Sequence, residues 1–327
     1  MKILIVNNTV IPALKYGGTE RVIWYLGKEL VKMGHQVDYL VKKGSSSSFA
    51  TKVMAIEESK PIEDQIPEGY DVVHFNFNVD AEKVEATHIV TIHGNTNEFL
   101  PYNKNAVFVS KNHAERHQSQ SFVYNGLDFS DYGKVDFSKD RKWFHFLGNV
   151  VWKEKNAKGA IDIAKRAKQK IVMLGGERFS TKMGIKFFPQ LNARFAGQVD
   201  ESGKNKYINQ SKGLIFPVKW DEPFGLSMIE SLYYGSPVFG TKHGSLPEII
   251  TPEVGFLSND SQELVDAIKN NTYNPKVCHH YAVDNFNSKL MAERYVEKYK
   301  LVLSGEDLNA DFPVLKEKQE SRFLEYN

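Results

Sequence analysis

Short apolar runs alternate with longer amphipathic segments along most of the chain. Residues 2–7 form an almost continuous run of apolar, mostly β-branched side chains, which is typical of a parallel strand buried on both faces. Residues 19–33 then repeat apolar side chains every three or four positions, which predicts a helix, and Gly34 stands where a helix often ends. Further strands are predicted at 36–41, 71–77, 88–93, 106–110 and 122–125. Strands that alternate with helices predict βαβ units and a mainly parallel sheet.

The pattern breaks in residues 126–141, which are polar and aperiodic, so we interpret them as a linker. Beyond them, strands are predicted at 143–148, 171–175, 194–199, 214–218 and 237–240, and helices at 157–168, 224–234, 261–270 and 288–303. We therefore predict two doubly wound α/β domains: residues 1–135, with the C-terminal segment 304–327 packing back on them, and residues 136–303. Ligands of such sheets bind at the carboxyl ends of the strands, so we expect the domains to face each other across a cleft.

Composition narrows the class of protein. The 327 residues exceed what one core usually holds, which favours two domains. The formal net charge of +2 disfavours a nucleic-acid binder. The single cysteine, Cys278, allows neither an internal disulfide nor a cysteine-rich zinc site, which fits a reducing compartment. No apolar stretch approaches the length of a spanning helix. We therefore expect a soluble cytoplasmic protein, and the sequence leaves peripheral membrane contact and the oligomeric state open.

Several familiar motifs are missing from the sequence. It contains neither a G-x-x-x-x-G-K-[ST] phosphate loop nor a G-x-G-x-x-G after the first strand, which disfavours P-loop NTPases and Rossmann dehydrogenases. His113 and His117 have a metal-compatible spacing, but Ala114 stands where zincins have glutamate, so we interpret them as histidines of an ordinary surface helix. The run 278–280 (CHH) lacks the spacing of ligands to one ion. We expect no metal site.

Two segments have the composition of phosphate-binding loops. The loop YGGTER places Gly17 and Gly18 before a predicted helix, where paired glycines allow close backbone approach and free N–H groups attract an anion. The segment FLGNVVWKEKNAKG places Lys153, Lys155 and Lys158 near the start of another predicted helix, where they could clamp a diphosphate by charge. A plain turn and a solvated charged loop are the structural alternatives, so neither segment is specific alone.

A third segment, WDEPFGLSMIESLYYGSP, is more specific. Glu222 precedes a proline and a glycine that suit a helix start, and Glu230 follows eight residues later. At 1.5 Å per residue, their separation along the helix axis is roughly 9–12 Å, about the span from a hexose to a ribose across a diphosphate. Two buried glutamates need hydrogen-bonding partners, which sugar hydroxyls would supply. The alternative for Glu222 is a helix cap. A further loop-to-helix turn, HGSLPEII, follows at residues 243–250.

These segments, in this order, resemble the retaining glycosyltransferases of family four, which have the GT-B fold of two Rossmann-like domains. The resemblance covers nearly the whole chain. It rests on GGTERV, VYNGLD, FLGNV…KG, MLGG, FAGQVD, the E-x7-E element EPFGLSMIE, and GSPV. The E-x7-E element is the specific part, and the glycine segments reinforce it by their order. The resemblance implies an N-terminal acceptor domain and a C-terminal nucleotide-sugar donor domain.

The resemblance also implies roles for residues of the third segment. Glu230 would bind the ribose hydroxyls of the nucleotide, and Glu222 would bind hydroxyls of the donor sugar near the reacting carbon. The backbone of Phe224, Gly225 and Leu226 would contact sugar and phosphate at the start of the helix, where the helix dipole favours an anion.

Other residues match the family outside that helix. Gly17 and Gly18 resemble the N-terminal loop beside the diphosphate, Lys158 matches the lysine of the phosphate clamp, and His93 resembles the histidine near the reaction centre. The family often has arginine after the glycine of the GR…KG segment, where this chain has Asn149. Lys153 or Lys155 would then supply the missing charge, although lysine does not reproduce the arginine fork.

The sequence thus predicts a metal-independent, retaining glycosyltransferase without a cofactor. Its donor would be a nucleoside diphosphate sugar, with UDP-sugars favoured and GDP-sugars the alternative. Its acceptor would be a hydroxyl of a glycan, a lipid-linked sugar or a small molecule. Two other functions stay open: another GT-B enzyme, such as a nucleotide-sugar epimerase or a glycosyl phosphorylase, and a non-catalytic nucleotide-sugar binding subunit. The E-x7-E element favours the transferase.

Overall fold

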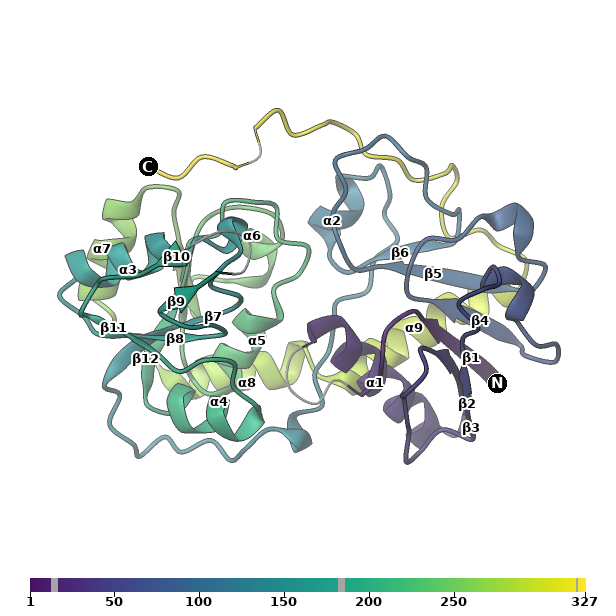
Figure 1. Ribbon diagram of the computed structural model, residues 1–327, viewed down its shortest axis with the longest axis horizontal. Coiled ribbons are helices and arrows are strands. Elements are labelled where there is room, and N and C mark those ends of the chain that lie inside the picture. The colour runs from purple at the N-terminus through teal and green to yellow at the C-terminus, as the bar shows by residue number, and fades with distance from the viewer. Residues whose placement is uncertain (13–16, 182–185, 322) are drawn as a thin grey trace. The chain divides into compact units, whose positions relative to one another are not determined.

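The computed structural model describes residues 1–12, 17–181, 186–321 and 323–327 and divides the chain into two compact units (Figure 1). Unit 1 comprises Met1–Asp128 and Phe286–Gln319, and unit 2 comprises Phe129–Asn285 and Glu320–Asn327. The chain therefore passes between the units after residues 128, 285 and 319.

This division differs from the predicted domains, 1–135 and 136–303. The last long helix belongs to unit 1 because its tyrosines bond side chains of the first sheet. The C-terminal segment 304–327 is shared, since its final residues pack on unit 2.

Unit 1 is built on a six-stranded parallel sheet with the order β3-β2-β1-β4-β5-β6. Its strands are β1 (Lys2–Asn7), β2 (Gln36–Val41), β3 (Lys52–Ala55), β4 (Val72–Phe75), β5 (His88–Ile92) and β6 (Ala106–Phe108). Its helices are α1 (Gly18–Lys32), α2 (Lys111–Glu115) and α9 (Ser288–Leu303), with single 3-10 turns at Glu63–Gln65 and Ala81–Lys83. The predicted strand at 122–125 is instead a loop segment, with one isolated bridge between Phe122 and Phe108.

Helices α1 and α9 lie side by side on one face of this sheet (Figure 1). Buried polar side chains join α9 to the sheet. His74 of β4 bonds Thr91 of β5 at 2.7 Å and Tyr299 of α9 at 2.8 Å, and the Thr91 hydroxyl lies 3.0 Å from that of Tyr295. These contacts explain why α9 belongs to unit 1 although it follows unit 2 in sequence.

The opposite face of the first sheet is closed by loops and by α2. His113 and His117 are buried there, with the His117 ring stacked on Phe108 at 4.9 Å between centroids. The prediction that they are surface histidines was therefore wrong. His113 lies on α2 and His117 in the turn after it, and both rings face inward, where they pack as aromatic side chains.

Unit 2 repeats the same strand topology. Its parallel sheet has the order β11-β8-β7-β12-β13-β14. The strands are β7 (Trp143–Leu147), β8 (Ile171–Leu174), β11 (Ala193–Phe195), β12 (Ser211–Phe216), β13 (Val238–Gly240) and β14 (Gly255–Leu257), and β9 (Phe179–Ser180) and β10 (Lys186–Phe187) form a separate antiparallel pair. The helices are α3 (Ala157–Arg166), α4 (Glu201–Ile208), α5 (Leu226–Tyr233), α6 (Leu246–Ile249), α7 (Ser261–Lys269) and α8 (Pro275–Asn285), with 3-10 turns at Phe129–Asp131 and Lys153–Lys155.

Apolar side chains of α3 and α7 join those of the second sheet in one buried cluster. Helix α5 lies against the sheet and packs on α8. His145 of β7 links sheet and helix, because its ring nitrogens lie 2.6 Å from Ser211 Oγ and 2.8 Å from Ser231 Oγ of α5. The cysteine of the CHH run, Cys278, is buried in α8. Within the described ranges, no helix is long and apolar enough to cross a bilayer.

Two of the buried histidines, His74 and His145, predict a pH-dependent stability for the units that contain them. Burial lowers the pKa of His74 and of His145 to about 3, from about 6.5 in an unfolded chain. Between these values the unfolded chain binds more protons, so the free energy of unfolding decreases as the pH falls. We expect each histidine to contribute a loss of about 1.4 kcal/mol between pH 7.5 and pH 5.5.

Denaturant unfolding at several pH values would measure this slope. His145→Asn should flatten the slope of unit 2, whereas the same change at exposed His280 should leave it unchanged. A wild-type stability that is constant between pH 7.5 and pH 5.5 would contradict the prediction.

Candidate functional site

The predicted site residues of unit 2 lie at the topological switch point of its sheet. Strands β7 and β12 are neighbours at the centre of the sheet, and the chain leaves them in opposite lateral directions. In such sheets the crevice beyond the carboxyl ends of these two strands is the usual ligand site. The lysine loop follows β7, and the loop that carries Glu222 follows β12. The fold therefore brings these two motifs, distant in sequence, to one place.

Glu222 forms a buried ion pair with Lys155. The Glu222 side chain is 7% exposed, and its Oε2 atom lies 2.5 Å from Lys155 Nζ and 2.8 Å from Trp220 Nε1, which donates to it. The Lys155 ammonium group also lies over the rings of Phe216, at 5.2 Å, and Trp220, at 5.0 Å. An ammonium group between two aromatic faces and a carboxylate is held in place and largely shielded from water.

The position of Lys155 follows from the residue after it. Asn156 has a left-handed backbone (φ 53°), which ends the 3-10 turn Lys153–Lys155 and starts α3. Its Oδ1 accepts from Gly159 N at 3.1 Å, and its Nδ2 donates to the Pro217 carbonyl oxygen at 2.9 Å. Asn156 thus caps α3 and ties the lysine loop to the loop after β12.

The structure separates the three lysines of the predicted phosphate clamp. Lys155 reaches Glu222, whereas Lys153 and Lys158 are exposed. Lys158, which matched the family lysine by sequence, lies on the first turn of α3. Asn149, at the position of the family arginine, accepts a hydrogen bond from Val151 N at 3.1 Å and so shapes the loop locally. The ammonium group beside Glu222 is therefore that of Lys155.

Glu230 is held by another lysine, which is buried. It lies in the middle of α5 with 2% exposure, and its Oε1 atom accepts from Tyr132 Oη at 2.8 Å and from Lys204 Nζ at 2.7 Å. Both glutamates thus have protein partners. The sequence analysis expected sugar hydroxyls as partners of these carboxylates, and the structure shows that a lysine from a remote segment also pairs with each one.

The start of α5 is shaped by two glycines. Gly225 is the residue before the first helical turn and has φ 83°, and it caps the helix without a side chain, so Glu222 is not the helix cap. Gly244 of the turn after β13 has φ 60°, and a Cβ atom there would lie 2.2 Å from Glu222 N. Ser245 N donates to the Glu222 carbonyl oxygen at 2.9 Å, and Ser245 Oγ donates to that of Phe224. Phe224 is buried, and Leu226 is the first residue of α5. The HGS turn therefore fixes the backbone around Glu222.

The predicted residues of unit 1 follow strands of its own sheet. Gly17 precedes α1 and Gly18 begins it, and the loop residues 13–16 lie outside the described residues. His93 follows β5, and its Nε2 atom lies 3.0 Å from Asn76 Oδ1. Burial lowers the pKa of His93 to about 4, so its imidazole is neutral at physiological pH. Because the Asn76 oxygen can only accept, Nε2 carries the proton of the neutral ring, and Nδ1 can accept one further hydrogen bond.

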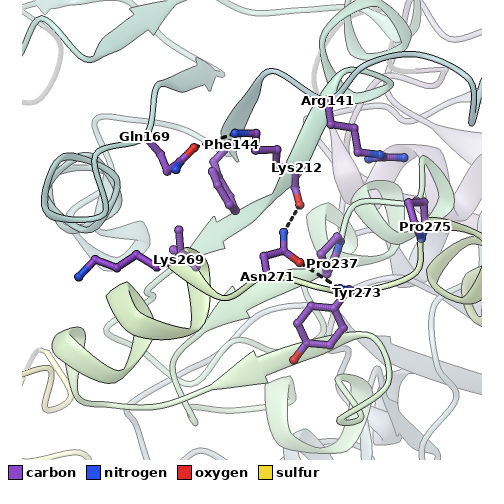
Figure 2. Close-up of a pocket in the computed structure, with 11 residues that line it drawn as sticks. Arg141, Phe144, Gln169, Lys212, Pro237, Lys269, Asn271, Tyr273 and Pro275 are labelled. Carbon is purple, nitrogen blue, oxygen red and sulfur yellow. Dashed lines mark hydrogen bonds between the residues drawn. The ribbon is translucent and has the colours of Figure 1, made fainter.

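A hollow of about 320 Å³ lies at the opposite, amino-terminal edge of the second sheet (Figure 2). Its cationic groups are already engaged. Lys212 Nζ donates to Gln169 Oε1 at 2.9 Å, Arg141 donates to the Tyr234 carbonyl oxygen at 2.9 Å, and Lys269 pairs with Asp266. The Asn271 side chain closes it by donating to the Lys212 carbonyl oxygen at 2.8 Å. These interactions hold the sheet edge together, and the motif residues lie at the other edge.

The segment that carries both glutamates is similar to a known protein family. Residues 131–284 match the family described as "Glycosyl transferases group 1", and they make up almost all of the continuous part of unit 2. The similarity to the group 1 glycosyl transferases therefore lies in unit 2.

By fold, the chain is similar to AviGT4, a glycosyltransferase involved in avilamycin A biosynthesis, with a TM-score of 0.75 and 21% identity over 93% of this chain and 98% of that one. It is also similar to HepE of Anabaena in complex with UDP and glucose, with a TM-score of 0.67 and 14% identity over 92% and 99%. The two six-stranded parallel units are the GT-B fold.

One relative is similar in sequence over a shorter stretch. An uncharacterized 41.2 kDa protein in the cps region of Klebsiella pneumoniae is 32% identical over 117 residues. These residues are 33% of this chain and 32% of that protein, so the match spans about a third of the relative's length.

The structure adds three residues that the sequence interpretation missed: Trp220, Lys204 and Tyr132. Trp220 stands inside the quoted motif, two residues before Glu222, and its indole was an available signal. Lys204 and Tyr132 lie in polar segments without a strong pattern, and only the fold shows that they reach Glu230.

Proposed function

We propose that this protein is a retaining glycosyltransferase that transfers a sugar from a nucleoside diphosphate sugar to an acceptor hydroxyl without a metal ion. One observation carries the proposal: two buried carboxylates, eight residues apart, are each paired with a lysine in the unit that matches the group 1 glycosyl transferases. Such residues offer acceptors for sugar hydroxyls and positive charge for a diphosphate in one crevice.

In this proposal the charge at the site serves the departing diphosphate. As the glycosidic bond breaks, negative charge grows on the leaving group, and preorganised positive groups stabilise it most in the transition state. Lys155 and the N–H groups at the very start of α5, at Leu226 and Ser227, are the groups best placed to do so. The exposed Lys153 and Lys158 would add only screened, longer-range attraction.

Glu222 and Glu230 have separate roles in this proposal. Glu230, two turns inside α5, would accept hydrogen bonds from the ribose, and Glu222, before the helix, from hydroxyls of the transferred sugar. Glu222 is held by Lys155 and Trp220, so we assign it to binding and not to attack on the sugar. We assign no side chain as a nucleophile. The acceptor hydroxyl would therefore attack the anomeric carbon from the face that the diphosphate leaves, which retains the anomeric configuration. The roles proposed for Gly17, Gly18 and His93 rest on the family resemblance alone.

A UDP-sugar is the donor that we favour, because HepE, which has a similar fold, binds UDP and glucose. A GDP-sugar is the alternative. The acceptor would be a glycan, a lipid-linked sugar or a small molecule, and no cofactor would be needed. We place the protein in the cytoplasm, where free thiols such as that of the buried Cys278 are usual. A lipid-linked acceptor would bring it into contact with a membrane surface.

Nucleotide binding by the Glu230→Gln variant tests the proposal. Glutamine keeps the size of the side chain and removes the charge that ribose hydroxyls would meet, so the Kd of the nucleoside diphosphate should rise by about 10- to 150-fold. Calorimetry would measure this with UDP, GDP or ADP, whichever gives the largest thermal shift. Glu253→Gln, at an exposed carboxylate of the same unit, is the matched control.

Three outcomes would contradict the assignment. An unchanged Kd in Glu230→Gln would remove Glu230 from the nucleotide site. Conversion of the donor sugar without an acceptor would indicate an epimerase, and tight donor binding without turnover on any acceptor would indicate a binding subunit.

A further inference from the structure

The buried lysine of this site, Lys204, indicates a residue role beyond the motif. Lys204 lies on α4 and is 5% exposed, and its Nζ atom lies 2.7 Å from Glu230 Oε1. The same oxygen accepts from Tyr132 Oη at 2.8 Å, and the Lys204 ammonium group lies 5.9 Å from the centre of the Tyr132 ring. The three side chains come from three separate segments of unit 2, so the carboxylate is held from two sides.

The energetics of such a pair favour a positioning role over a stabilising one. Two charges taken out of water gain little net stability, and apolar residues of similar volume often replace a buried ion pair without loss. Removing only one partner is costly, because the other charge stays buried. A buried lysine that pairs with a proposed binding carboxylate therefore has a clear use in keeping that carboxylate charged and fixed in one orientation.

The surroundings of Glu230 limit its movement further. Ser231, the next residue of α5, bonds His145 of β7, and the Tyr132 ring packs on Tyr233 of the same helix at 5.6 Å between centroids. Helix α5 is thus fixed to the sheet on one side, and the Tyr132 segment packs on it. The Lys204–Glu230 ion pair is therefore formed on a rigid backbone. Binding groups that are held before the ligand arrives lose less conformational entropy on binding.

We propose that Lys204, together with Tyr132, is a positioning residue that sets the Glu230 carboxylate to accept hydrogen bonds from the ribose hydroxyls of the nucleotide. The inference rests on the proposed function, in which Glu230 meets the ribose. A carboxylate has about four lone-pair sites over its two oxygens, so Glu230 can accept from hydroxyl donors as well as from Tyr132 and Lys204. Lys204 itself need not touch the nucleotide.

The ribose hydroxyls provide a readout that a structural role would not change. UDP and 2′,3′-dideoxy-UDP differ only in these hydroxyls, so the ratio of their Kd values reports the ribose contact. We expect the wild-type protein to prefer UDP by about 10-fold or more. In Lys204→Met this preference should fall below about 3-fold, because UDP loses affinity and the dideoxy compound does not. If GDP or ADP binds more tightly, the corresponding pair replaces UDP.

Matched variants separate a loss of the positioning effect of Lys204 from a change of charge and from a folding defect. Lys204→Arg keeps the positive charge and should restore part of the preference. Lys206→Met changes an exposed lysine of the same helix and should keep the wild-type ratio. Should Lys204→Met fail to fold, Tyr132→Phe removes one donor to Glu230, leaves the ion pair, and should lower the preference by about 3-fold.

The outcomes distinguish this inference from the proposed function. If Glu230→Gln keeps the wild-type ratio, Glu230 does not contact the ribose and the proposed function fails. If Glu230→Gln abolishes the preference while Lys204→Met, or Tyr132→Phe in its place, retains it or weakens both nucleotides equally, the positioning role is overturned.

Discussion

Replacing Lys155 with methionine is expected to lower kcat by about 100- to 1,000-fold, the usual effect of removing one preorganised group that stabilises transition-state charge. The same variant should lose about 3–5 kcal/mol of unfolding free energy, because Glu222 would stay buried without its ammonium partner. The matched change Lys158→Met should leave both quantities near wild type, since Lys158 is exposed on α3. Steady-state kinetics and denaturant unfolding of the two variants provide the comparison.

A double variant tests whether the loss of activity in Lys155→Met comes from a folding defect. Lys155→Met with Glu222→Gln removes both buried charges, so it should recover much of the lost stability while transfer stays low. Activity that falls in Lys158→Met and survives in Lys155→Met would reverse the assignment. An absolute requirement for Mg²⁺ or Mn²⁺, tested by chelation, would contradict the metal-free mechanism.

The second large effect is expected for Glu222→Gln. Glutamine keeps the shape and an acceptor oxygen for Lys155 and Trp220, but it accepts more weakly from sugar hydroxyls than a carboxylate does. The kcat/KM for sugar transfer should fall by about 10- to 150-fold, and the Kd of the bare nucleoside diphosphate should not change. Measured together, these two constants separate the sugar contact from the nucleotide contact.

Two results would count against this role of Glu222. Normal transfer kinetics in Glu222→Gln would mean that the carboxylate has no important part in turnover. A weaker binding of the bare nucleotide would mean that the variant disturbs the loop, which Glu253→Gln should not do.

The architecture was predictable from the sequence because parallel strands buried on both faces leave continuous apolar runs. The runs at residues 2–7 and 36–41 coincide with β1 and β2, and α9 has the predicted bounds. Most other predicted strands were too long, since apolar side chains continue into the loops beyond the last paired residue. β12 instead begins three residues before its predicted start, and β3 and β14 were not predicted. Helix α4 was missed because its sequence, ESGKNKYI, is mostly polar and has no apolar stripe.

The site was predictable where its residues are neighbours in sequence and not where they are distant. Glu222 and Glu230 belong to one continuous segment, in which a proline and a glycine mark the start of the helix. Their spacing in the sequence therefore predicted their positions relative to the helix. Which lysine reaches Glu222 depends on the left-handed backbone at Asn156. The spacing of the three lysines in the sequence does not predict this conformation. Lys204 looks like any surface lysine, and only the packing of α4 buries it beside Glu230.

The three passages of the chain between its units have a consequence for synthesis on the ribosome. The first sheet is translated within 128 residues, but α9, whose Tyr295 and Tyr299 bond its buried side chains, ends at residue 303. At bacterial or eukaryotic rates of about 5–20 residues per second, the sheet waits roughly 10–35 s for that helix. Unit 2 emerges in the meantime. A nascent chain that stops after residue 285 would therefore contain every residue of the candidate site and still leave an apolar face of its first sheet open to chaperones or to aggregation.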